Sequence, residues 1–95
     1  MNNQISLVIP TRNDEKFLKL LLISINNQTC HPQEIIIVDS STDQATNNTI
    51  KKLDVKIPII YHREKKAYPG KARNIGVKMA KNNWIAFLDS KTIPE

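Results

Sequence analysis

The stretch Glu34-Ile35-Ile36-Ile37-Val38-Asp39 decides the fold that this sequence predicts. Four β-branched residues in a row leave no polar face, which is typical of a strand buried on both sides in a parallel sheet. A second apolar run, from Ile5 to Ile9, ends at Pro10 and predicts another short buried strand. Two strands of this kind indicate a core built around the middle of a sheet.

Helical patterns separate the apolar runs. After the first strand, Asn13 or Asp14 can cap a helix whose apolar residues recur at i, i+3, i+4 and i+7. A weaker helix follows the polar turn from Ser40 to Thr46. The buried face of the first helix comprises Leu18, Leu21, Leu22 and Ile25. The remaining elements are a strand from Pro58 to Tyr61, a helix with the inner face Ala72, Ile75, Gly76 and Met79, and a strand from Trp84 to Asp89.

Strands that alternate with helices predict an α/β fold with right-handed crossovers. We expect a Rossmann-like three-layer sandwich of four mostly parallel strands and three helices, formed by residues 1–95 as one domain. Ligands of such sheets bind at the carboxyl ends of the strands. Polar groups follow three strands, at Thr11 to Asp14, at Asp39 and at Asp89. Each Asp alone would more often form a turn or cap, but the three together favour a site.

Composition narrows the possible functions. The net charge of +5 favours anionic partners such as nucleotide phosphates. The single cysteine, Cys30, excludes an internal disulfide, and His31 and His62 lack metal-ligand spacing. The only glycines, Gly70 and Gly76, exclude both a G-x-G-x-x-G motif and a P-loop. No secretory signal opens the chain and no apolar run approaches the ~20 residues of a spanning helix, so we expect a cytoplasmic location.

Four segments resemble motifs of the family 2 glycosyltransferases, in that family's order. Residues 5–14, ISLVIPTRND, are similar to V-S-V-V-I-P-T-Y-N-E, and residues 34–43, EIIIVDSSTD, to E-I-I-V-V-D-D-G-S-T-D with one residue fewer. Residues 72–76 match A-R-N-x-G, and residues 84–89 resemble the strand before a D-x-D motif. The resemblance covers nearly the whole chain and implies the N-terminal, nucleotide-sugar-binding part of an inverting enzyme with a GT-A fold.

The resemblance also implies a role for individual residues. Asp39 would accept a hydrogen bond from the base, as a carboxylate can from an N–H of uracil. Arg73 would approach the nucleotide from the third helix, beside Lys71 at a helix start that already favours anions. Asp89 would be the first carboxylate of a metal site. The base pocket would be lined by Pro10, Thr11, Arg12 and Asp14.

Two departures from the family pattern change the expected chemistry. Arg12 replaces the usual aromatic residue, although a guanidinium plane can also stack on a base. Asp89-Ser90-Lys91 replaces D-x-D, and a Mg²⁺ or Mn²⁺ site with one carboxylate beside an ammonium should be weak. Either Lys91 itself neutralises the diphosphate, or Asp89 holds a metal with help from residues beyond Glu95.

The resemblance implies a UDP-sugar as donor, an acceptor that the sequence does not identify, and a part in cell-surface polysaccharide synthesis. It also allows the full-length protein to be membrane-associated. A catalytic base is expected in the second half of the family's domain, so we expect no transfer by residues 1–95 alone. A four-stranded sheet leaves an open edge, which favours a homodimer.

Two other classes of protein compete with this interpretation. A basic α/β module could bind nucleic acid through the face from Arg63 to Arg73, but we expect no such partner, because aromatic residues are few and Trp84 and Phe87 are predicted to be buried in a strand. A receiver domain would need an aspartate after its third strand. That strand ends here in Tyr61 and His62.

Overall fold

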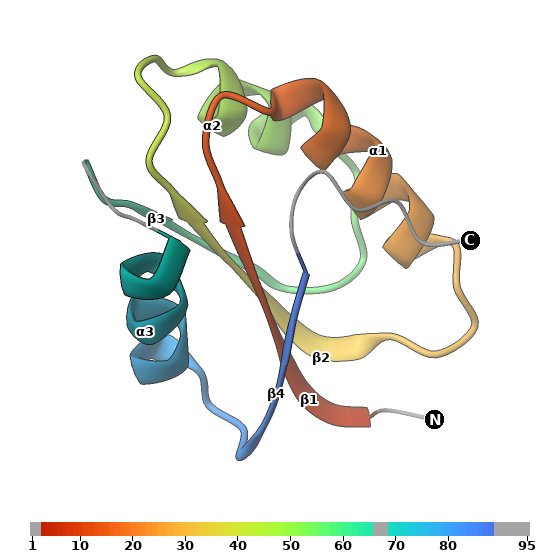
Figure 1. Ribbon diagram of the computed structural model, residues 1–95. Coiled ribbons are helices and arrows are strands. Elements are labelled where there is room, and N and C mark those ends of the chain that lie inside the picture. Colours follow the sequence, from red (N-terminus) through yellow and green to blue (C-terminus); the bar gives the residue numbers. More distant parts are fainter. Residues whose placement is uncertain (1–2, 66–68, 89–95) are drawn as a thin grey trace.

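The computed structural model describes residues 3–65 and 69–88, in which strands and helices alternate as predicted (Figure 1). In chain order the elements are β1 (Asn3–Thr11), α1 (Glu15–Asn26), β2 (Pro32–Asp39), α2 (Ala45–Lys52), β3 (Ile59–Arg63), α3 (Pro69–Met79) and β4 (Trp84–Phe87).

The four strands form one sheet in the order β3-β2-β1-β4, and all three neighbouring pairs are parallel. β1 and β2 therefore occupy the middle of the sheet, where a strand is covered on both faces. Residues 7–9 of β1 and 35–38 of β2 are at most 5% exposed. The prediction of a parallel α/β sheet from the two apolar runs is confirmed.

Helices cover both faces of the sheet, which gives three layers (Figure 1). On one face, α1 and α2 pack against alternate residues of the central strands, among them Ile9 and Ile37. On the other face, α3 packs against the residues between them, such as Val8 and Ile36. The predicted inner face of α1, Leu18, Leu21, Leu22 and Ile25, is buried.

α3 approaches β1 closely at one position. A Cβ atom added to Gly76 would overlap the side chain of Val8, so only glycine fits between this helix and the sheet. Ala72, one turn earlier, is 3% exposed and belongs to the same cluster. The A-R-N-x-G segment thus has a packing role in addition to any role in a site.

A buried carboxylate ties the turn between α3 and β4 to the amino end of the sheet. Glu34 Oε2 accepts hydrogen bonds from the Ser6 hydroxyl at 2.5 Å and from the Lys81 backbone N–H at 2.7 Å. Ser6 Oγ accepts in turn from the backbone and side-chain amides of Asn82, at 3.3 and 3.1 Å. This cluster fixes where β4 begins.

Pro10 does not end β1 as predicted, because the strand continues to Thr11. The Leu88 N–H donates to the Val8 carbonyl, so Val8 turns its backbone polar groups toward β4. Pro10 lies two residues further along and turns the same way. Because β4 pairs with β1 only as far as Val8, the missing N–H of Pro10 costs the sheet no hydrogen bond.

Both ends of the basic segment from Arg63 to Lys71 belong to regular elements. Arg63 still belongs to β3, where it pairs with Asp39, and Lys71 lies inside α3. The helix begins at Pro69, and proline is favoured at a first helical position because its fixed φ suits the helix and its missing N–H would have no partner there.

The predicted burial of Trp84 and Phe87 is wrong: these side chains are 75% and 44% exposed. β4 is an edge strand of four residues, so it lacks the second neighbour that covers β1 and β2. Among the described residues, no helix is long and apolar enough to cross a membrane.

Candidate functional site

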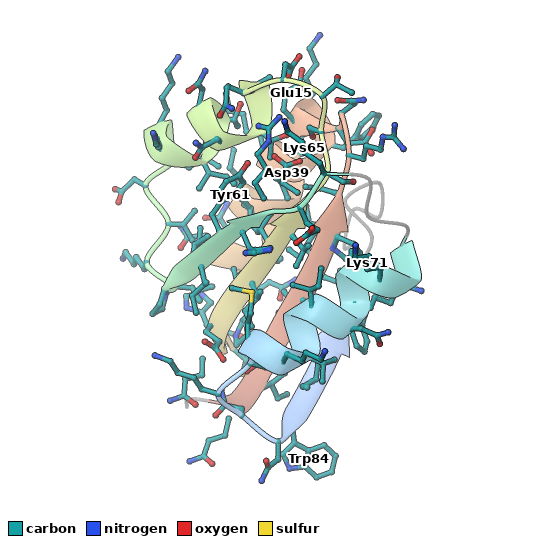
Figure 2. All side chains as sticks on the ribbon, turned by 90° about the vertical axis from the view of Figure 1, so that its left-hand side faces the viewer. Glu15, Asp39, Tyr61, Lys65, Lys71 and Trp84 are labelled. Atoms are coloured by element: carbon teal, nitrogen blue, oxygen red, sulfur yellow. The ribbon has the colours of Figure 1, made fainter. Side chains whose placement is uncertain are left out.

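The carboxyl ends of β1, β2 and β3 meet at one rim of the sheet. Thr11 pairs with Asp39 in the register of β1 and β2, and the Thr11 carbonyl accepts the Ser40 N–H at 3.0 Å. The Asp39 carbonyl accepts the Glu64 N–H at 2.8 Å just beyond β3. Figure 2 shows Asp39 at this rim, at the opposite end of the sheet from Trp84. The rim is where a parallel sheet places its ligands.

The carboxylate of Asp39 lies beneath this rim with no exposed surface. Its Oδ1 accepts the Ser41 backbone N–H at 2.9 Å, and its Oδ2 accepts the Tyr61 hydroxyl at 2.6 Å. Burial and, to a lesser degree, the contact with Asp39 raise the pKa of Tyr61 to about 12. Tyr61 therefore stays protonated and donates at neutral pH.

Thr11 faces the same side of the sheet as Asp39 and is 4% exposed. Its Oγ1 atom is buried and has no hydrogen-bond partner among residues 3–65 and 69–88. Buried hydroxyl groups nearly always have partners, because an unmade hydrogen bond leaves the cost of desolvation uncompensated. The rim thus pairs a carboxylate that can accept with a hydroxyl that is free to donate.

Hydrogen bonds that involve side chains connect the β1–α1 turn to the β2–α2 turn beside this pair. The Asn13 N–H donates to Ser41 Oγ at 2.7 Å, and Asn13 Oδ1 accepts from the N–H and the hydroxyl of Thr42, at 3.0 and 3.2 Å. Ser41 Oγ also lies 3.2 Å from Thr46 Oγ1. Asn13 has a φ of 53°, a left-handed conformation that asparagine tolerates well. The bonds hold the β1–α1 and β2–α2 turns in fixed positions.

Arg63 also supports these turns. Its guanidinium donates to the Asp43 carbonyl at 2.8 Å and to the Ser41 carbonyl at 2.9 Å. Neither Arg63 nor Tyr61 was predicted as part of a site. Both follow Asp39 by more than twenty positions in the chain, and only the register of β2 and β3 brings them to it.

The other residues that the sequence predicted for the site lie at the end of β1, at the start of α1 and near the start of α3. Arg12 is exposed, Pro10 is half-buried in β1, and Asp14 is partly exposed at the N-cap of α1, where it makes no capping hydrogen bond. Lys71 and Arg73 are exposed near the start of α3, and Figure 2 shows Lys71 at the end of the helix nearer to Asp39. A ligand that contacts both Asp39 and α3 must cross the rim, because they lie on opposite faces.

Asp89, Ser90 and Lys91 lie outside the described residues. Within residues 3–65 and 69–88, no three His, Cys, Asp or Glu side chains are grouped so that they could hold a metal ion. The expected Mg²⁺ or Mn²⁺ and its ligand Asp89 remain predictions of the sequence.

Comparison with known proteins gives one consistent family. The model of "Glycosyl transferase family 2" matches residues 6–94. A poly(ribitol-phosphate) β-glucosyltransferase of Bacillus spizizenii is 38% identical over 92 residues, which is 92% of this chain and 14% of that protein. The chondroitin synthase of Escherichia coli is 33% identical over 95% of this chain and 14% of its own length.

Solved structures agree in fold. The crystal structure of Staphylococcus aureus TarS 1–349 in complex with UDP-GlcNAc matches 94% of this chain and 27% of its own, with a TM-score of 0.80 and 33% identity. A crystal structure of the same segment in complex with UDP matches equally well. This chain thus spans about a seventh of the two relatives above and about a quarter of the TarS segment. Its sheet order, its carboxyl-end site and these matches agree: the chain belongs to glycosyl transferase family 2 and has the first part of a GT-A fold.

Proposed function

We propose that this chain binds the nucleotide part of a UDP-sugar at the carboxyl rim of its sheet, as part of an inverting glycosyltransferase. The observation that carries the proposal is the buried pair of Asp39 and Thr11, in which an acceptor lies across from a hydroxyl that has no partner in the described part of the chain. The TarS structures in complex with UDP and UDP-GlcNAc support the choice of ligand.

The chemistry of the pair suits uracil. Each carboxylate oxygen of Asp39 can accept two hydrogen bonds, and each accepts one from the residues that the structure describes. One position on each oxygen is left for the N3–H of the base. The Thr11 hydroxyl can donate to a neighbouring carbonyl of the same ring. Because Asp39 has no exposed surface, the base reaches it only when a covering side chain moves.

The diphosphate would extend across the rim toward α3. Lys71 and Arg73 are exposed near the start of this helix, where the helix dipole adds to their positive charge. Arg12 is exposed beside Thr11 and offers a planar guanidinium that can stack on the base. Asp89 would hold a Mg²⁺ or Mn²⁺ ion that neutralises the diphosphate, or Lys91 would supply that charge itself.

The activity of the whole protein follows from its family and is part of the proposal. The donor sugar would pass to an acceptor, and the names of the relatives, a poly(ribitol-phosphate) β-glucosyltransferase and a chondroitin synthase, support a polysaccharide or another sugar-bearing polymer as product. A homodimer through the open edge of β4 is supported by the exposure of Trp84 and Phe87 on that strand. Membrane association and a cytoplasmic location remain predictions.

Calorimetric titration with UDP tests the proposal on the chain itself. We expect Asp39→Asn to lower the affinity for UDP by about tenfold or more, because an amide is a weaker acceptor than a carboxylate and its NH₂ group opposes the N3–H. The control is Asp54→Asn, the same change at an exposed loop residue, which should leave the affinity unchanged. A folded wild-type chain that does not bind UDP at millimolar concentration would refute the proposal.

A further inference from the structure

The Tyr61 hydroxyl donates a short hydrogen bond, of 2.6 Å, to Asp39 Oδ2 at the rim. Hydroxyl bonds to a carboxylate are short because the charge strengthens them. Together with the Ser41 N–H on the other oxygen, the phenol fixes the plane of the carboxylate. Each oxygen keeps a further lone pair that can accept a hydrogen bond from a ligand.

The sheet explains how Tyr61 reaches this position. Tyr61 pairs with Ile37, so it stands two residues before the partner of Asp39 on the same face of the sheet. Its ring packs against the core cluster beneath α1 and α2, which limits a side chain that already has few torsions. The hydroxyl at the tip of a fixed ring is therefore held diagonally across the strands, on Oδ2.

Tyr61 also has the protonation state that this role requires. Burial, followed by the hydrogen bond to Asp39 and the charge of that carboxylate, raises the pKa of the phenol to about 12. The nearby Arg63 acts in the opposite direction but does not prevail. The phenol is therefore a donor throughout the physiological range of pH.

We propose that Tyr61 is a positioning residue that gives the rim its preference for uracil over cytosine, by holding the Asp39 carboxylate in a fixed orientation as the acceptor for the base. The inference rests on the function proposed above. Uracil presents an N3–H donor, whereas cytosine presents a lone pair at the same ring position. A carboxylate held in one orientation matches the first and repels the second, and one that can rotate discriminates less.

The test compares the affinities for UDP and CDP, measured by calorimetry at neutral pH, in the wild-type chain and in Tyr61→Phe. The substitution removes only the hydroxyl. We expect the ratio of the UDP affinity to the CDP affinity to fall by roughly threefold to tenfold, which is the effect of one net hydrogen bond. The change should lie in the UDP affinity, with the CDP affinity nearly constant.

Two controls separate positioning from a general loss of stability. Ile59→Val shortens a core side chain on the same strand and face, and should leave the ratio unchanged. In an Asp39→Asn background, Tyr61→Phe should no longer alter the ratio, because the residue through which it acts is gone.

Three results would overturn the inference. An unchanged ratio in Tyr61→Phe would show that the hydroxyl does not contribute to base selection. A higher UDP affinity in that variant would show that the phenol covers Asp39 instead of supporting it. Equal loss of UDP and CDP binding would indicate a purely structural role. All three leave the proposed function intact, whereas a wild-type chain that binds neither nucleotide refutes the proposed function first.

Discussion

The two central strands place a hydroxyl residue opposite a carboxylate residue at two positions, but the hydrogen bonds at the two positions differ. Near the amino end of the sheet Ser6 pairs with Glu34, and at the carboxyl end Thr11 pairs with Asp39. Both carboxylates are buried, at 4% and 0% exposure. Ser6 donates its hydroxyl to Glu34. Thr11 donates to no group in the described part of the chain, and Asp39 takes its hydrogen bonds from elsewhere.

The difference separates a structural site from a functional one. At the amino end, the chain satisfies its own buried groups, and the turn between α3 and β4 closes over them. At the carboxyl end, a buried donor stays unused beside a carboxylate that can accept more bonds. An unmade buried hydrogen bond costs stability, and a ligand that completes it would recover that cost on binding.

The largest expected effect is on the amino-end pair. Glu34→Ala removes the acceptor of the Ser6 hydroxyl and of the Lys81 N–H. We expect the free energy of unfolding to fall by about 2–4 kcal/mol, because the buried Ser6 hydroxyl and the partly buried Lys81 N–H lose their acceptor and a small cavity forms. Denaturant unfolding measures the change. Glu64→Ala, at a partly exposed residue paired with His62, is the control and should cost less than about 1 kcal/mol. A loss that small at Glu34 would mean that its cluster does not stabilise the fold.

A smaller effect distinguishes the two hydroxyl groups directly. Ser6→Ala should lower the free energy of unfolding by about 1–2 kcal/mol, since it removes a group with three hydrogen bonds. Thr11→Val keeps the side-chain shape and removes a hydroxyl without a partner, so stability should be unchanged or higher by up to about 1 kcal/mol. Chemical denaturation of both variants gives the comparison. If Thr11→Val is as destabilising as Ser6→Ala, the Thr11 hydroxyl has a partner after all.

The smallest effect is a dependence of stability on alkaline pH. Because folding raises the pKa of Tyr61 from 10.0 to about 12, the folded state favours the protonated phenol. This contribution is complete below pH 10 and is lost as the pH rises toward 12. The stability advantage of the wild-type chain over Tyr61→Phe should therefore shrink across that window, as measured by urea unfolding at several pH values. An advantage that stays constant from pH 8 to about 12 would contradict the raised pKa of Tyr61, whose causes are burial first and the contact with Asp39 second.

Patterns over neighbouring residues predicted most of the fold. Burial is indicated directly by two patterns, the four β-branched residues in β2 and the i, i+3, i+4 spacing in α1. The structure agrees with both. Trp84 and Phe87 have the same apolar character but lie on an edge strand. Composition does not reveal whether a strand has one neighbour or two, and for that reason their exposure could not be predicted.

The site was predictable only in part. Asp39 and Thr11 stand at the ends of recognisable strands, so their rim could be identified from the sequence. Tyr61 and Arg63 act on residues twenty or more positions earlier, through a register that no local pattern encodes. In the sequence, Arg63 is one of several positive charges in a basic segment. In the structure, its guanidinium donates hydrogen bonds to two backbone carbonyls.

The most direct test of a nucleotide site at the carboxyl rim is a titration of the isotopically labelled chain with UDP, followed by amide chemical shifts. We predict that the amides of Thr11, Asp39 and Ser41 shift, while those of Glu34, Lys81 and Asn82 at the opposite end do not. Shifts concentrated at the amino end, or none at millimolar UDP, would contradict the assignment of function to this rim.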